Sequence, residues 1–275
     1  MAFVEVAADV YVLRYPVLDV NATLVVGGQN AAVVDTLSTD AQARELLAAV
    51  RLVTPLPLVL VNTHHHFDHC FGNVVLAEAS PGCPVWAHES AARLLREEAE
   101  DLRRRWYEEF RVTEPDLAEG LVAVDVLAPD RTVHTRATVD LGDRVVELRH
   151  LGRGHTDGDL VVAVPDAAVL VAGDLVEQSG PPGFGDSFPL DWPETVAALL
   201  HLVTPATAIV PGHGAIMDAD LVRAQHDDLT ELAWLIREGH ADGAAAEAVA
   251  AKAPFNVRSA LTAVKRGYAE LSGRI

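Results

Sequence analysis

The chain has 275 residues, half of them apolar, which is enough for one large domain or two ordinary ones with a substantial core. Its 40 acidic residues exceed the 21 basic ones, and the formal charge of −19 argues against a nucleic-acid-binding protein and against attachment to an acidic membrane surface. The chain has only two cysteines, Cys70 and Cys83, so it has no disulfide framework, which favours a reducing compartment.

The N-terminal third alternates short apolar runs with turns. The runs that predict strands are residues 10–16, 22–28, 30–36, 57–63 and 84–90. The sequence GGQN at 27–30 predicts a hairpin, and residues 38–53 predict a helix with a serine or threonine N-cap. The first residues contain neither a basic region nor a long apolar run, and no later run could span a bilayer. We therefore expect a cytoplasmic protein without a secretory signal.

The rest of the chain mixes helices with further strands. Residues 89–111 have the charged pattern that is typical of one exposed helix. The other predicted elements are strands at 138–152, 159–166, 167–174 and 208–214, a helix at 192–203, and helices from 218 onward with breaks at 239–243 and 252–255. Because strands flanked by helices occur in both halves, we expect two packed sheets with helices outside them.

The sequence NTHHHFDHCFGN, residues 62–73, concentrates possible metal ligands directly after a buried strand. In an extended segment the side chains alternate, so His64 and His66 fall on one side and His65 on the other. If a helix begins near Asp68, then Asp68 and His69 can face a second point nearby. Neutral imidazole and carboxylate groups are the ligands that zinc and similar metals prefer.

Three further donors follow apolar strands, at turns made of small residues. His155 lies in GHTDGD, Asp174 ends the run AAVLVAGD, and His213 lies in PGHG. In each case a rigid strand ends, small residues allow a tight turn, and one donor projects from it. One segment rarely supplies a whole metal site, so we expect these donors to meet the histidine cluster.

In their order and spacing, HHHFDH, GHTDGD, AGDL and PGHG resemble the metallo-β-lactamase-fold hydrolases, over residues 10 to 215. The resemblance implies an α/β (α+β) fold, a four-layer αββα sandwich with two metals at one edge. Residues 1–217 would form the catalytic domain, and residues 218–275 a helical C-terminal extension packed on it. The nearest branches are the seven-ligand hydroxyacylglutathione hydrolase-like and lactonase-like enzymes.

Carried over by position, the resemblance fills every ligand position of a binuclear centre. His64, His66 and His155 would bind the first metal, and Asp68, His69 and His213 the second. Asp174 would bridge both ions, and Asp68 and Asp174 are the predicted catalytic residues. We expect two divalent ions, zinc first, with iron or manganese as alternatives.

The implied reaction is metal-assisted hydrolysis, in which a hydroxide activated by two zinc ions attacks the carbonyl of a small thioester, lactone or related acyl substrate. One alternative is a mononuclear non-haem iron dioxygenase acting on persulfides, with His64, His155 and Asp174 as its ligands. A β-lactamase-like activity is another, although zinc β-lactamases of this family have cysteine or no ligand at the position of Asp174. The sequence does not decide between a monomer and a homodimer.

The segment LVEQSGPPGFGDSFPLDW, residues 175–192, directly follows the predicted metal ligand Asp174. It shows no helical or strand periodicity, and a loop of this length without periodicity is typical of functional loops. We expect its aromatic side chains to pack over the cleft or against the helix at 89–111, and loop and helix together to form the wall of an apolar substrate pocket beside the metals. The predicted substrate-binding residues are Phe184, Phe188, Trp192, Trp106 and Tyr107. The C-terminal helices carry Lys252, Arg258, Lys265 and Arg266, which either grip a substrate or cover a solvated face, and we favour the solvated face.

Overall fold

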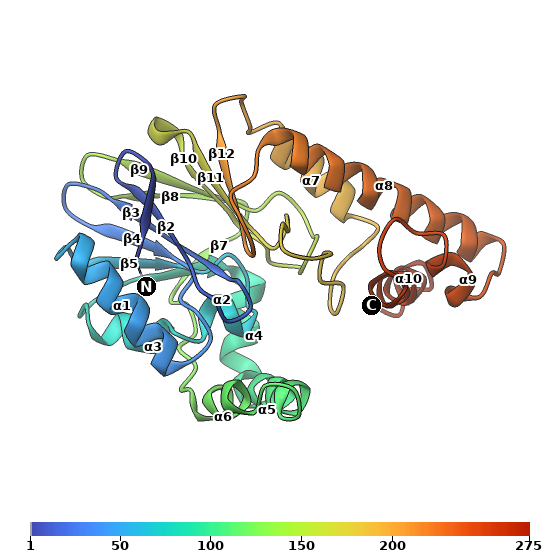
Figure 1. Cartoon of the computed structure of the whole chain (residues 1–275), viewed down its shortest axis with the longest axis horizontal. Helices are drawn as coiled ribbons and strands as arrows, with labels where there is room; N and C mark the ends of the chain where they lie inside the picture. Colours follow the sequence, from blue (N-terminus) through green and yellow to red (C-terminus); the bar gives the residue numbers. More distant parts are fainter. Residues whose placement is uncertain (1) are drawn as a thin grey trace.

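Two β-sheets pack face to face in the computed structural model of the chain, which describes residues 2–275 (Figure 1). The first sheet has the order β1-β2-β3-β4-β5-β6-β7 and the second the order β12-β11-β10-β9-β8. The strands are β1 (Val4–Ala7), β2 (Val10–Arg14), β3 (Asn21–Val26), β4 (Ala31–Val34), β5 (Leu58–Val61), β6 (Val85–His88), β7 (Arg131–Val133), β8 (Arg136–Asp140), β9 (Val145–Arg149), β10 (Val161–Val164), β11 (Val169–Gly173) and β12 (Ala208–Pro211).

Helices cover the outer faces of both sheets (Figure 1). They are α1 (Asp40–Val53), α2 (Phe67–Cys70), α3 (Asn73–Glu78), α4 (Glu89–Glu97), α5 (Ala99–Phe110), α6 (Pro115–Ala123), α7 (Trp192–Leu200), α8 (Ala219–Ala241), α9 (Ala246–Ala250) and α10 (Val257–Leu271), with a 3-10 turn at Pro165–Ala167. Among residues 2–275, none of these helices combines the length and the apolar composition needed to span a bilayer.

The apolar side chains separate into layers because successive side chains of a strand point to opposite faces of the sheet, and all residues of β4, β5 and β11 are buried. In β5, Val59 and Val61 belong to the core between the two sheets, while Leu58 and Leu60 belong to the core beneath α1 and α3. A further core joins the second sheet to α7, α8, α9 and α10. The result is the four-layer αββα arrangement that the sequence predicts.

Two predicted elements differ in detail from the structure. The single helix expected at 89–111 is broken at Glu98 into α4 and α5, because α4 packs on β6 and β7 whereas α5 packs on α6. The single strand expected at 138–152 is instead the hairpin of β8 and β9. Gly142 in its turn has a φ of 110°, a left-handed conformation that glycine adopts without strain.

Candidate metal centre

The predicted donors gather at the edge where the parallel strands end. β4 pairs in parallel with β5, and β11 pairs in parallel with β12. The segment His64–His69 follows β5, Asp174 follows β11, and His213 follows β12 closely. Carboxyl ends of parallel strands meet at one edge of a sheet, where open α/β folds place their sites. Asn21 ties the two sheets together there, since its side-chain amide donates to the carbonyls of Pro211 at 3.0 Å and Gly214 at 2.9 Å.

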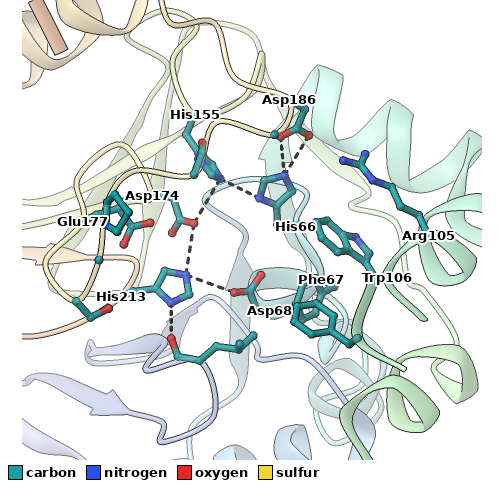
Figure 2. A pocket seen from close by; sticks show the side chains of 17 residues that line it. His66, Phe67, Asp68, Arg105, Trp106, His155, Asp174, Glu177, Asp186 and His213 are labelled. Carbon is teal, nitrogen blue, oxygen red and sulfur yellow. Dashed lines mark hydrogen bonds and ion pairs between the residues drawn. The ribbon is translucent and has the colours of Figure 1, made fainter. Parts of the chain in front are cut away.

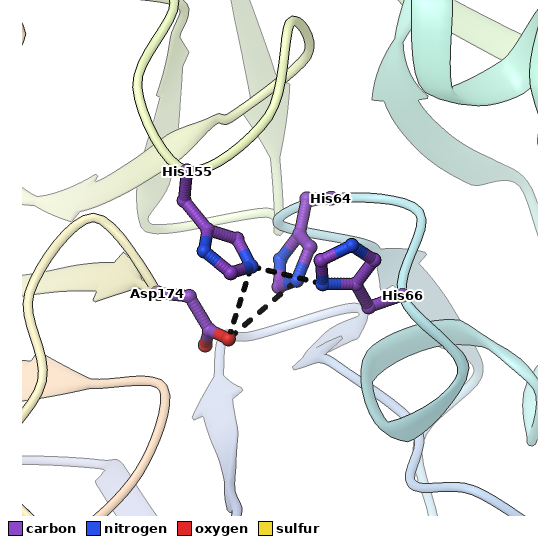
Figure 3. Close-up of side chains that lie close together, drawn as sticks. All are labelled: His64, His66, His155 and Asp174. Carbon is purple, nitrogen blue, oxygen red and sulfur yellow. Dashed lines mark hydrogen bonds and ion pairs between the residues drawn. The ribbon is translucent and has the colours of Figure 1, made fainter. Parts of the chain in front are cut away.

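The first cluster consists of His64, His66, His155 and Asp174, which converge from three separate loops (Figure 3). One donor atom from each of the four lies within 4.8 Å of the others. Asp174 Oδ2 lies 3.4 Å from His155 Nε2 and 3.7 Å from His64 Nε2. All four residues are buried, with at most 9% of their surface exposed, so water contributes little to their solvation.

The second cluster consists of Asp68, His69 and His213, and Asp174 lies between the two clusters. His213 Nε2 lies 3.3 Å from Asp68 Oδ2 and 3.4 Å from Asp174 Oδ2. His69 Nε2 lies 3.2 Å from Asp174 Oδ1. Gly212 is required beside this group, because a Cβ atom at that position would overlap the Asp174 carboxylate. The structure therefore brings all seven predicted ligands together.

Hydrogen bonds on the outer side of the rings fix which nitrogen faces the centre. Carbonyl and carboxylate oxygens can only accept, so the ring nitrogen beside them must carry the proton. The inward nitrogens are then Nε2 in His69, His155 and His213, and Nδ1 in His66. The outer acceptors are Asp35 for His69 at 2.8 Å, Gly183 O for His155 at 3.1 Å, Leu18 O for His213 at 2.7 Å, and Asp186 for His66 at 3.1 Å.

This proton arrangement leaves lone pairs facing one another. His66 Nδ1 lies 2.9 Å from His155 Nε2, and His69 Nε2 lies 3.3 Å from His213 Nε2. Two bare nitrogens repel at such distances unless a proton or a metal cation lies between them. His64 Nε2 and Asp174 Oδ1 are also buried without a hydrogen-bond partner. Buried polar atoms in this state are costly, and a pair of divalent cations would satisfy them all.

The pKa values of the clustered histidines shift in opposite directions. Burial lowers the pKa of His155 to about 4 and lowers that of His64 well below its usual value. Burial also lowers the pKa of His213, but the nearby Asp174 and Asp68 carboxylates outweigh it and raise that pKa to about 10. The same carboxylates raise the pKa of His69 against the effect of burial. Burial also lowers the pKa of His66, but the Asp186 carboxylate outweighs it and raises that pKa, so among the histidines of the two clusters only His64 and His155 are held neutral by burial.

A cavity of about 380 Å³ opens beside the clusters (Figure 2). Its metal-facing side holds His66, Asp68, His155, Asp174 and His213. Its apolar wall is formed by Leu18, Phe67, Trp106, Phe110 and Pro181. Arg105, Glu177 and Asp186 add charged groups, and Arg105 is the one arginine or lysine among the described residues that line it. The cavity therefore combines an apolar wall with one arginine and several carboxylates.

Of the five aromatic residues predicted to bind substrate, the structure places only Trp106 in the wall of this cavity. Trp192 and Phe184 are buried and pack on each other, and Phe184 also contacts Phe255 of the C-terminal segment. The guanidinium groups of two arginines lie over the Phe188 ring. Tyr107 lines a separate surface hollow with residues of α5 and α6.

Four residues that were not predicted from the sequence also lie at the site, namely Asp35, Arg105, Glu177 and Asp186. Asp35 follows the apolar strand β4 as Asp174 follows β11, so the same pattern marks it. Glu177 and Asp186 lie within the loop that the sequence marks as functional. No local pattern distinguishes Arg105 from the other arginines of α5.

The profile of the metallo-beta-lactamase superfamily matches residues 15–213. The chain is 25% identical to a type 2 metallo-beta-lactamase of Bacillus sp. (strain 170) over 59% of this chain and 54% of that protein. It is 30% identical to an acyl-coenzyme A thioesterase of Gallus gallus over 57% of each chain. It is 50% identical to a hydroxyacylglutathione hydrolase of Gloeobacter violaceus over a stretch of 60 residues, and this stretch covers 22% of each chain. The chain thus spans about half the length of the first curated relatives it matches.

The fold has clear counterparts among solved structures. A metallo-beta-lactamase from Pontibacter korlensis superposes with a TM-score of 0.65 at 23% sequence identity, over 83% of this chain and 98% of that one. At this identity the likeness concerns the fold, and it confirms the αββα architecture.

Proposed function

The chain belongs to the metallo-β-lactamase superfamily, and on that premise we propose that it is a binuclear metal-dependent hydrolase of a small acyl substrate, with a thioester as the first candidate. In this proposal His64, His66 and His155 hold one divalent ion, and Asp68, His69 and His213 hold the other. Asp174 lies against both clusters and bridges them. Zinc is the first candidate metal, because the ligands are imidazole and carboxylate.

The observation that carries the proposal is the pair of opposed ring nitrogens, at 2.9 Å in the first cluster and 3.3 Å in the second. The outer hydrogen bonds place one proton of each ring on the outer nitrogen, so the inner nitrogens of each pair face one another and need a shared proton or a metal cation between them. One ion would satisfy one pair only, which supports two ions. When bound, such ions lower the pKa of water toward about 7 and polarise a carbonyl oxygen.

The protein groups position the reactants. Asp68 faces the cavity beside His213, where it can orient a water molecule or accept its proton. Phe67, Trp106 and Phe110 offer an apolar surface for the acyl part. Arg105 forms no ion pair among the described residues, unlike the adjacent Arg104, and it can bind an anionic group of the leaving part.

The rival functions use this site differently. A mononuclear iron dioxygenase needs only His64, His155 and Asp174, and the intact second cluster favours the hydrolase. A β-lactamase activity is favoured by the relative from Bacillus, whereas Asp174 in place of a cysteine favours thioesters or lactones.

Elemental analysis and a substrate panel test the proposal. Protein purified without chelator should contain about two zinc ions per chain. It should hydrolyse a thioester or lactone faster than a β-lactam or a phosphodiester, and chelator should abolish that activity. One tightly bound iron per chain, with oxygen consumed on a persulfide, would instead establish the dioxygenase.

A further inference from the structure

Asp186 lies beside the first cluster and is not one of the proposed ligands. Its carboxylate lies 3.2 Å from His65 Nε2 and 3.1 Å from His66 Nε2. A carboxylate only accepts hydrogen bonds, so both rings donate from Nε2. In His66 this fixes the tautomer whose bare Nδ1 atom faces His155 (Figure 2). Without Asp186, the His66 ring could rotate or carry its proton on the nitrogen that faces the centre.

Contacts from α10, the last helix, fix the position of Asp186. Arg266 of α10 donates from Nη2 to the Asp186 carbonyl and from Nε to the Ser187 carbonyl, both at 2.9 Å. Its guanidinium also lies over the Phe188 ring, 5.6 Å from the centroid. A planar guanidinium that binds two successive carbonyls fixes the direction of the backbone as well as its distance. Arg266 thereby fixes the backbone position from which the Asp186 side chain extends.

We propose that Asp186 is a positioning residue for His66 and that Arg266 holds Asp186 in place, so that α10 forms part of the support of the first metal cluster. The inference rests on the proposed metal ligands, and it makes the C-terminal helices necessary for full metal affinity. The donor atoms of His65, His66 and Asp186 also lie within 4.8 Å of one another. Two hydrogen bonds already satisfy this group, so the proposal assigns no third ion to it.

Zinc affinity in a competition with a chromophoric chelator tests the proposal. Asp186→Ala and Arg266→Ala should each weaken one of the two zinc sites by about ten-fold or more, the usual effect of losing a group that orients a metal-bound histidine. The other site should be unchanged. Arg237→Ala is the matched control, because Arg237 of α8 donates to the Leu190 carbonyl of the same loop at 3.0 Å without holding Asp186.

The ring protonation of His66 gives a second readout, from nitrogen-15 NMR of metal-free and zinc-loaded protein. The native protein should show a proton on Nε2 in both states, and Asp186→Ala should show a mixture of tautomers when metal-free. If Asp186→Ala does not fold, Asp186→Asn serves in its place, because an amide offers one acceptor oxygen to two donating rings.

Unchanged zinc affinity and unchanged tautomer in the Asp186 variants would overturn the proposal. An equal loss in Arg237→Ala and Arg266→Ala would overturn the role of Arg266, and a third zinc ion per chain would show that Asp186 is a ligand. A native protein that binds two zinc ions without hydrolysing any substrate would refute the proposed reaction and leave this inference intact.

Discussion

The Oδ2 atom of Asp35 lies 2.8 Å from Nδ1 of His69, and the same carboxylate also supports the first cluster. It accepts hydrogen bonds from the backbone N–H and the hydroxyl of Thr63, each at 2.8 Å. The Thr63 hydroxyl oxygen in turn lies 3.1 Å from Nδ1 of His64. Asp35, which is only 2% exposed, therefore orients one proposed ligand of each cluster.

Replacing Asp35 by alanine should weaken both zinc sites and destabilise the protein by about 3 kcal/mol, because the change breaks a buried charged network and leaves its donors unsatisfied. Zinc stoichiometry and urea unfolding of the metal-free protein measure the two effects. Asp143→Ala is a suitable control, since Asp143 accepts an N–H from Gly28 at 2.6 Å in an exposed turn away from the site. Similar losses in both variants would show that Asp35 has no special role.

Replacing Asp174 by alanine should reduce the affinity for both metal ions, because Asp174 lies between the clusters. Gly212→Ala should do the same without removing any donor, since its Cβ atom would displace the Asp174 carboxylate. His65→Ala should leave both metal sites nearly full. The His65 ring is directed to Asp186, and its removal leaves the hydrogen bond between Asp186 and His66 intact. Metal content after dialysis compares the three, and equal losses from Asp174→Ala and His65→Ala would contradict the proposed ligand set.

The cluster of proposed ligands could be predicted from the sequence, whereas the contacts that orient these side chains could not. His64, His66, Asp68 and His69 lie in one short segment, so their spacing alone indicates a shared site. Asp35 and His69 are 34 positions apart, and Arg266 reaches Asp186 across 80 positions. Such contacts depend on how strands pair and where helices pack, which no local pattern encodes.

The loop at 175–192 shows the same limit. Its aromatic residues indicate burial, and Phe184 and Trp192 are buried. The pattern does not tell which surface covers them, because the partner Phe255 belongs to the C-terminal segment. The apolar wall of the cavity comes instead from residues after β5 and on α5, where Phe67 packs against Trp106 and Phe110.

Arg105→Ala should raise KM for a thioester with an anionic leaving part by roughly ten-fold, the effect of losing one charge-assisted hydrogen bond. KM for a neutral thioester and the zinc content should not change, because Arg105 contacts no proposed ligand. Steady-state kinetics should be measured on a charged and a neutral thioester with the same acyl chain, so that the two KM values can be compared. Arg104→Ala, the neighbouring change on α5, is the control, and equal effects on both substrates would place the anion elsewhere.

Asp159 is a buried carboxyl group that holds the turn after His155. It accepts hydrogen bonds from the Thr156 N–H at 2.9 Å and the Thr156 hydroxyl at 2.6 Å. Burial raises the pKa of Asp159 to about 7, and these two hydrogen bonds only partly oppose it. In the unfolded chain the carboxyl returns to an ordinary pKa near 4. Between these values the folded protein holds a proton that the unfolded chain has released.

The sign of the pH dependence follows from this difference in bound protons. The contribution of Asp159 to the free energy of unfolding is fully present below about pH 4 and is lost as the pH rises toward about 7. Asp159→Asn cannot titrate, so the free energy of unfolding of the native protein minus that of the variant should fall as the pH rises from 4 to 8. Urea unfolding of both metal-free proteins across this range measures the difference and excludes metal binding from it. A difference that stays constant or rises with pH would show that Asp159 is already ionised in the folded protein at pH 4.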